Sequence, residues 1–279
     1  MQIIQRRKIF YIISLIIIIP GLVSLFMQGL NLGIDFTGGS ILHVKIENNV
    51  NAGEVRSVLE ELDLEKAEVQ KSGDEFYIRT VELSQEQTKE LLNDLKDKFG
   101  KVEFLSAESV GPTIGKELTR NAILALLIAG VLMLIYITVR FEFHFGIAAI
   151  AAIIHNVLVV LGIFSLFQWE INSSFIAAIL TVIGYSINDT IVIFDRIREN
   201  MKFKLKEDRM TLLNRSIMQT LNRSINTVLT SAFALVALLV FGGATIKIFV
   251  LAMLIGFVTG AYTSIFIASP IWYELKARA

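Results

Sequence analysis

Apolar and charged positions along the chain are arranged in long blocks. Six stretches contain no Asp, Glu, Lys or Arg and consist mainly of Ile, Leu, Val, Phe and Ala. A helix needs about 20 apolar residues to cross the hydrocarbon core of a bilayer, so each stretch predicts one transmembrane helix. The stretches are residues 9–34, 121–139, 145–169, 171–188, 224–246 and 248–273.

Two of these stretches need interpretation. A basic cluster at residues 6–8 precedes the first, as in a cleaved signal peptide, but the apolar run continues to Met27 without a small-x-small cleavage site. A transmembrane helix is therefore the preferred reading. The fourth stretch stops at Asp189, but apolar residues resume at Ile191, so we expect that helix to continue past the acid.

The polar segment 30–118 has the shorter periods of a folded domain outside the membrane. The expected elements are strands at 41–47, 67–71, 75–81 and 102–109, and helices opening at the capping boxes Asn51/Glu54 and Ser84/Gln87, the second ending at Gly100. The order βαββαβ is the split-βαβ, ferredoxin-like arrangement. The predicted fold class is a polytopic α-helical membrane protein with six transmembrane helices and one α+β ferredoxin-like extracytoplasmic domain between helices 1 and 2.

Composition and charge add the orientation. Hydrophobic residues make up 54% of the chain, and the mean hydropathy is +0.62. The net charge of zero conceals a division, because segment 30–118 holds 18 acids and 10 bases, and the remainder 16 bases and 8 acids. In a six-span topology the basic clusters fall on one side, which by the positive-inside rule is the cytoplasm.

This topology divides the chain into three parts and places the protein in the cell membrane. Residues 1–29 form an N-terminal cytoplasmic segment and the first transmembrane helix. Residues 30–118 form the extracytoplasmic domain. Residues 119–279 form transmembrane helices 2–6, with a basic cytoplasmic loop near 196–222, and both termini are cytoplasmic.

The amino-acid composition and the absence of certain motifs also argue against several functions. A neutral chain lacks the basic excess of a nucleic-acid binder. The absence of Cys and the presence of only three His disfavour metal sites, and no GxxxxGK[ST] phosphate loop is present. No nucleophile–base pairing is evident in the polar domain. We therefore expect no enzyme activity, no cofactor and no metal.

Polar residues recur at helical spacing in the last three spans. Each set lies on one helix face, which must contact protein or water because hydroxyls and amides go unsatisfied in lipid. For the small residues, helix packing is the preferred explanation. The sets are Thr181, Gly184, Tyr185, Asn188 and Asp189; Arg223, Asn226, Thr227, Thr230 and Ser231; and Gly256, Thr259, Gly260, Thr263 and Ser264.

Asp189 differs from the other polar residues because an ionised carboxylate in a span costs about 2.5–3.5 kcal/mol even on the lenient insertion scale. Such a residue usually has a cationic partner or takes up a proton. Arg223, near the same end of the next span, is the candidate partner, although it could instead only anchor the topology. We predict a proton-coupling pair of Asp189 and Arg223, supported by Tyr185, Asn188, Asn226 and Thr227. His155, in the third span, is a weaker relay candidate and is more typical of a packing histidine.

Glycines also mark the entry to the polar domain. Gly33, Gly38 and Gly39 surround Asp35 just after the first span. This composition predicts a tight, preshaped turn at the membrane surface, with a plain turn into a strand as the alternative.

Three motifs carry a family resemblance. They are LGIDFTGGS at 32–40, VGPTIGKEL at 110–118 and GYSINDTIVIFDRIREN at 184–200. These motifs resemble the SecF subunits of bacterial SecDF protein-export complexes, which belong to the resistance–nodulation–division (RND) superfamily. The resemblance covers essentially the whole chain.

The resemblance implies a partner, SecD, which would supply six further spans and an acid facing Asp189. It also implies association with the SecYEG channel, unfolded preprotein and membrane lipids, and use of the proton-motive force for export. The family's transmembrane acid falls on Asp189, and its arginine on Arg223. Two alternatives stay open: half of an RND-type small-molecule or lipid exporter, and a non-energised membrane scaffold.

Overall fold

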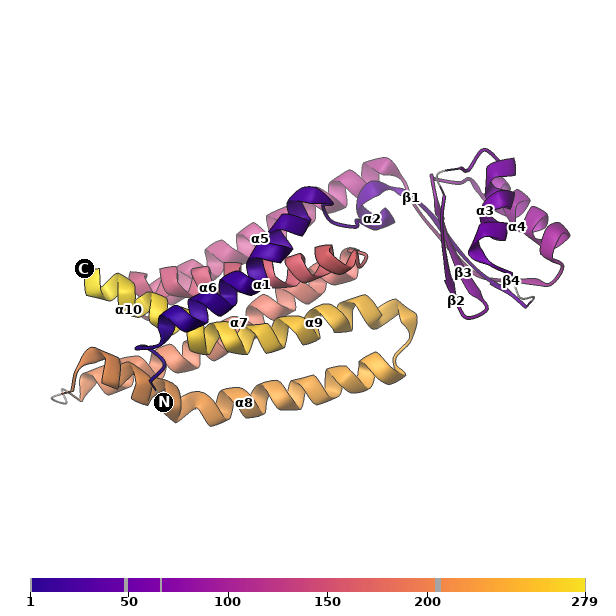
Figure 1. Cartoon of the computed structure of the whole chain (residues 1–279). Coiled ribbons are helices and arrows are strands. Elements are labelled where there is room, and N and C mark those ends of the chain that lie inside the picture. Colours follow the sequence, from indigo (N-terminus) through magenta and orange to yellow (C-terminus); the bar gives the residue numbers. More distant parts are fainter. Residues whose placement is uncertain (1, 48–49, 66, 204–206, 279) are drawn as a thin grey trace. The chain divides into compact units, whose positions relative to one another are not determined.

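Two compact units make up the computed structural model of the chain, which describes residues 2–47, 50–65, 67–203 and 207–278. One unit contains Met1–Asn31 and Ile123–Ala279. The other contains Leu32–Ala122. We call them the bundle unit and the sheet unit and describe each by itself (Figure 1).

Within the described residues, six helices are long and apolar enough to cross a membrane, as the charge-free stretches predict. The last is continuous through three consecutive segments, one of them a π-helix. The helices are α1 (Arg7–Met27), α5 (Pro112–Arg140), α6 (Phe143–Phe167), α7 (Ser173–Lys202), α8 (Arg209–Phe241), and the series α9 (Ala244–Thr263), η1 (Ser264–Ala268) and α10 (Ser269–Arg278).

The helix of the fourth stretch does continue past Asp189, as far as Lys202. The segment 196–222, expected to be a basic loop, is therefore mostly helical, because α7 occupies its start and α8 begins at Arg209. Charged residues end the apolar span without ending the helix. Residues 204–206 of this predicted loop lie outside the described residues.

Close helix contacts build the core of the bundle unit. At the crossing of α1 and α6, a Cβ atom added to Gly21 would lie 2.7 Å from the Cα of Gly162. At the crossing of α7 and α9, a Cβ atom on Gly256 would lie 2.3 Å from a methyl carbon of Val182. Small residues thus let the helix backbones approach, which confirms packing as the role of Gly256.

The flanking helices are packed less completely. Large apolar side chains of α5 are exposed over most of its length, among them Leu127, Leu132 and Val139. The same holds for Phe233 and Val240 of α8. These surfaces suit lipid or a second protein.

The sheet unit has the predicted βαββαβ order. Its antiparallel sheet has the order β2-β3-β1-β4, so β3 separates β1 from β2, and β1 separates β3 from β4. Each βαβ unit is therefore split by one strand. A one-turn helix α2 (Ile34–Thr37) precedes β1 (Gly39–Ile46), α3 (Ala52–Glu61), β2 (Glu68–Ser72), β3 (Glu75–Thr80), α4 (Gln85–Phe99) and β4 (Val102–Val110).

Local signals explain these elements. Both capping boxes form, at Asn51 and at Ser84, and Gly100 ends α4 with φ of +79°. Alternate residues of β1 point inward, where Leu42 and Val44 are buried with the apolar faces of both helices. The core of the sheet unit is therefore one layer between the sheet and α3 and α4.

Candidate functional site

Asp189 lies on α7 with its two carboxylate oxygens in different surroundings. Ser224 of α8 donates a hydrogen bond to Oδ1, at 2.6 Å. Oδ2 is buried and has no hydrogen-bond partner among the described residues. A buried carboxylate oxygen without a donor is costly, but a proton on it removes the negative charge. The site is thus suited to a carboxyl group that changes protonation state.

A set of hydroxyl groups lies beside Asp189, where α7 meets the π-helix η1. Thr190 Oγ1 and Ser264 Oγ are 2.8 Å apart, and the Ser264 hydroxyl also lies 3.2 Å from the Ser186 carbonyl oxygen, to which it donates. All three residues are buried. π-Helical turns often mark functional sites, and Ser264 is the first residue of this one. The hydroxyls join α7 to the last span.

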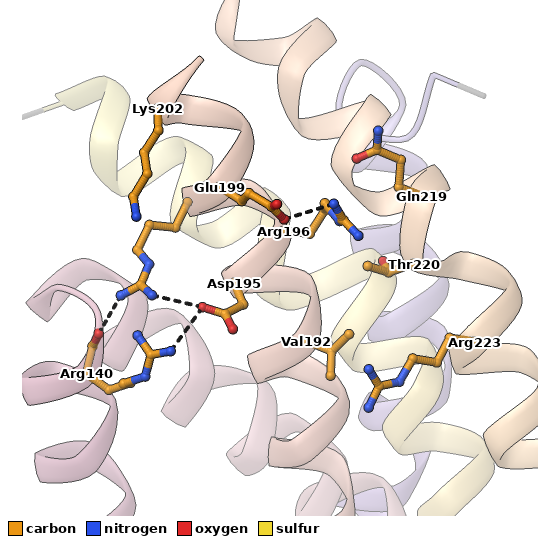
Figure 2. Close-up of a pocket in the computed structure, with 10 residues that line it drawn as sticks. Arg140, Val192, Asp195, Arg196, Glu199, Lys202, Gln219, Thr220 and Arg223 are labelled. Atoms are coloured by element: carbon orange, nitrogen blue, oxygen red, sulfur yellow. Dashed lines mark hydrogen bonds and ion pairs between the residues drawn. The ribbon is translucent and has the colours of Figure 1, made fainter. Parts of the chain in front are cut away.

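Arg223 lies near enough to Asp189 for its positive charge to act on the carboxylate, but the two side chains do not form a close ion pair. No contact within 4.0 Å joins the two side chains, and within the described residues Arg223 pairs with no carboxylate. Successive residues of a helix point about 100° apart. Ser224, not Arg223, is therefore the residue of α8 that reaches Asp189, whereas the Arg223 side chain extends toward Val192 of α7 (Figure 2).

The four supporting residues divide into two groups. Tyr185 packs inside the bundle unit, where its ring stacks on Phe257 at 3.8 Å and its hydroxyl donates to Ser231 at 3.3 Å. Asn188, Asn226 and Thr227 are exposed. Exposed amides and hydroxyls in a membrane span need protein or water beside them.

The third span adds a polar contact to the last. Asn156 is buried and donates to the Gly256 carbonyl at 3.1 Å, while Thr259 donates to the Asn156 side chain. Neither ring nitrogen of the neighbouring His155 has a hydrogen-bond partner among the described residues. Asn156, to which the sequence alone assigns no role, thus ties α6 to α9.

The glycine motif forms a one-turn helix followed by an extended entry into β1. Gly38 and Gly39 have φ of +76° and +129°, which side-chain-bearing residues rarely adopt. A Cβ atom on Gly39 would also lie 2.5 Å from the Thr80 carbonyl oxygen. Gly33 accepts a hydrogen bond from Thr37, at 3.1 Å, and Asp35 lies in the helix between them. The positive φ angles therefore require glycine at both Gly38 and Gly39.

The geometry of Asp189 could be found only in part from the sequence. The acid itself stands out, because it interrupts an apolar span. Its donor Ser224 does not, since serine is common in transmembrane helices and lies next to the more conspicuous Arg223. Ser264 was part of a polar set, but its contacts depend on the π-helical turn.

Fold and site define a multi-pass membrane protein with one split-βαβ unit between its first and second spans. Two family models match the chain. "Protein export membrane protein SecD/SecF, C-terminal" matches residues 90–278, and "SecD/SecF GG Motif" matches residues 23–50, which include Gly38 and Gly39. The chain belongs to the SecF family of protein translocase subunits.

Full-length relatives agree with this assignment. Protein translocase subunit SecF of Acidaminococcus fermentans is 46% identical, with 99% of this chain and 98% of the relative covered. SecF of Sebaldella termitidis is 41% identical, with 99% and 92% covered.

Longer relatives join a SecF-like part to further sequence. Protein translocase subunit SecDF of Bacillus subtilis is 40% identical over 98% of this chain, which spans 38% of that protein. The crystal structure of SecDF from Thermus thermophilus, described as a translocon-associated membrane protein, superposes with a TM-score of 0.92 at 38% identity. All of this chain and 39% of that chain are covered.

Proposed function

We propose that this chain is an auxiliary subunit of the Sec protein translocase. It works with a SecD partner and uses the proton-motive force to promote export of preproteins through the SecYEG channel. It has no enzymatic activity of its own. Both termini are cytoplasmic, and the sheet unit lies outside the cell membrane. The observation that carries this proposal is Asp189, an acid in a membrane span with one oxygen bonded to a hydroxyl and the other without a donor.

The coupling step begins at the Asp189 carboxylate. A proton from the outer side binds to Oδ2 and gives a neutral carboxylic acid. The Ser224 hydroxyl, which donates to Oδ1 at 2.6 Å, holds the neutral acid less strongly than the anion. Release of the proton to the cytoplasm restores the negative charge and the stronger bond. Each proton thus alternately tightens and loosens the contact between α7 and α8.

Arg223 takes part through its charge rather than through a fixed ion pair. Its exposed guanidinium lies on the residue next to Ser224, near enough for its positive charge to act on the Asp189 carboxylate without a close contact. An approaching cation favours the ionised carboxylate and thereby proton release. Arg223 therefore helps the acid to lose its proton during each cycle.

The SecD partner covers the polar surface that this chain leaves exposed. Asn188, Asn226 and Thr227 need protein or water within the membrane. A partner with six spans would supply that contact and a second acid near Asp189. Each SecDF relative, of which this chain spans 38% or 39%, joins its SecF-like part to further sequence in one chain, which supports such a partner.

Movement of the spans reaches the sheet unit through its two covalent connections. One is the glycine motif around Asp35, which α1 leads into, and the other is α5. Gly38 and Gly39, which have positive φ angles, lead from α2 into β1. A displacement of α1 reaches β1 along this covalent path.

The test is Asp189→Asn, which keeps the shape and hydrogen-bonding capacity but cannot titrate. We expect it to abolish the part of preprotein export into membrane vesicles that depends on the proton-motive force, while copurification with SecD is unchanged. Asp195→Asn is the matched control on the same helix. Its carboxylate is 47% exposed and pairs with Arg198 at 3.1 Å, so export should persist. Full export by Asp189→Asn would contradict the proposal and leave the scaffold alternative.

A further inference from the structure

A charged pocket opens where α5, α7 and α8 lie near the cytoplasmic ends of their spans in the proposed topology. Its volume is about 410 Å³. Five of its lining side chains are cationic and two are anionic, an excess of three positive charges. Figure 2 shows these side chains, which are Arg140, Asp195, Arg196, Arg198, Glu199, Lys202 and Arg223, together with Val192, Gln219 and Thr220.

The two carboxylates do not neutralise the pocket. Asp195 accepts from Arg198 at 3.1 Å and lies 3.5 Å from Arg140. Glu199 accepts from Arg196 at 2.8 Å.

Two cations of the pocket have no carboxylate of the described residues within 4.0 Å. Lys202 and Arg223 pair with no carboxylate among the described residues. Gln219 accepts a hydrogen bond at its side-chain oxygen, which leaves its amide nitrogen as a further donor. An anion in the pocket would thus meet two unneutralised charges and at least one neutral donor.

The position of the pocket favours a membrane anion over a soluble one. It lies at the end of apolar spans, the depth at which lipid headgroups meet a protein. Arg140 is the last residue of α5, and exposed apolar side chains lie along the same helix at Leu132, Ile135 and Val139. Their spacing places them on one face, which suits an acyl chain.

We propose that this pocket binds the phosphate headgroup of an anionic phospholipid from the cytoplasmic leaflet. Lys202 of α7 and Arg223 of α8, which pair with no carboxylate among the described residues, contact the phosphate, and the acyl chains follow the apolar face of α5. Binding at this site does not depend on the role of Asp189. Basic pockets between transmembrane helices are suited to anionic headgroups, because each Lys or Arg near the surface adds attraction that zwitterionic lipid lacks.

The experiment measures lipid retained by the full chain purified with its SecD partner, using native mass spectrometry. Dioleoylphosphatidylglycerol is the probe, and dioleoylphosphatidylcholine is the comparison. The wild-type complex should retain the anionic lipid in preference. Lys202→Gln and Arg223→Gln should each weaken that binding about fivefold, which corresponds to about 1 kcal/mol per charge. Both side chains are exposed, so neither change should prevent folding.

Lys247→Gln is the matched control, because Lys247 is also exposed but lies at the opposite end of the bundle unit, near the start of α9. It should leave lipid binding unchanged. Equal retention of both lipids, or wild-type binding by both pocket variants, would overturn the proposal. Displacement of the lipid by millimolar inorganic phosphate would reassign the pocket to a soluble anion. Binding to the chain alone but not to the complex would assign it to the partner protein instead.

Discussion

The bundle unit and the sheet unit use the same chemical group in opposite ways. In the sheet unit, the Glu47 carboxylate is exposed and accepts from the Lys101 ammonium at 2.6 Å. In the bundle unit, one oxygen of Asp189 accepts from the Ser224 hydroxyl, and the other is buried without a hydrogen-bond donor within the described residues. Water solvates the Glu47 carboxylate whether or not Lys101 is paired with it. The Asp189 carboxylate has to be stabilised by neighbouring protein groups, so its protonation state can be linked to helix packing.

The two cores differ in a related way. The sheet unit buries apolar side chains that water would otherwise surround, so the hydrophobic effect stabilises it. Spans in a bilayer gain little from that effect, because lipid is as apolar as they are, and close packing and polar contacts hold them together. Substitutions should therefore destabilise the sheet unit through lost apolar burial and the bundle unit through disturbed helix packing.

The largest expected effect is on the core of the sheet unit. Phe76 on β3 is fully buried, and Phe76→Ala should lower the free energy of unfolding of this unit by about 3–5 kcal/mol. Phe104 on β4 is 46% exposed, so Phe104→Ala should cost much less. Denaturant titration of the two variants measures the difference. Equal losses would contradict the assignment of the core to one face of the sheet.

A smaller loss is expected where α9 packs on α7. Gly256→Ala places a methyl group within 2.3 Å of Val182, and such overpacking costs about 1–3 kcal/mol. Gly130→Ala on α5 is the control, because no atom lies within 4 Å of its added Cβ atom. Thermal denaturation in detergent should show a lower Tm for Gly256→Ala only. A stable Gly256→Ala protein would argue against close packing as the main cohesion of the bundle unit.

The contact of Asp189 with α8 should have an effect on function rather than on folding. Ser224→Ala removes the donor to Oδ1, and we expect export driven by the proton-motive force to slow about fivefold, the equivalent of one hydrogen bond of about 1 kcal/mol. Thr230→Ala is the control, because that hydroxyl donates only to carbonyls of its own helix. Equal export rates in the two variants would remove Ser224 from the mechanism.

The difference between the units also explains what could be predicted from the sequence. Spans, capping boxes and the βαββαβ order depend on local pattern, and each could be predicted correctly. The choice between Arg223 and Ser224 depends on the rotation of α8 about its axis, because adjacent residues point about 100° apart. The polar face at Asn188 and Asn226 is exposed, and in the proposed complex residues of the SecD partner cover it. The local sequence pattern predicts neither which residue of α8 faces Asp189 nor what covers the polar face.

The smallest expected effect is on the ion pair of the sheet unit. The hydrogen bond from Lys101 lowers the pKa of Glu47, and both side chains are exposed. A lowered pKa in the folded state means that the pair contributes stability above the ordinary pKa of 4.5 and that this contribution is lost as the pH falls below it.

Glu47→Gln removes this contribution at neutral pH. Because water and salt screen exposed pairs, the Tm of the variant should match that of the wild type within error at pH 7 and at pH 3. A clear loss at pH 7 that disappears at pH 3 would show that this carboxylate, like Asp189, depends on its partner. The contrast between the two units would then rest on the packing of their cores alone.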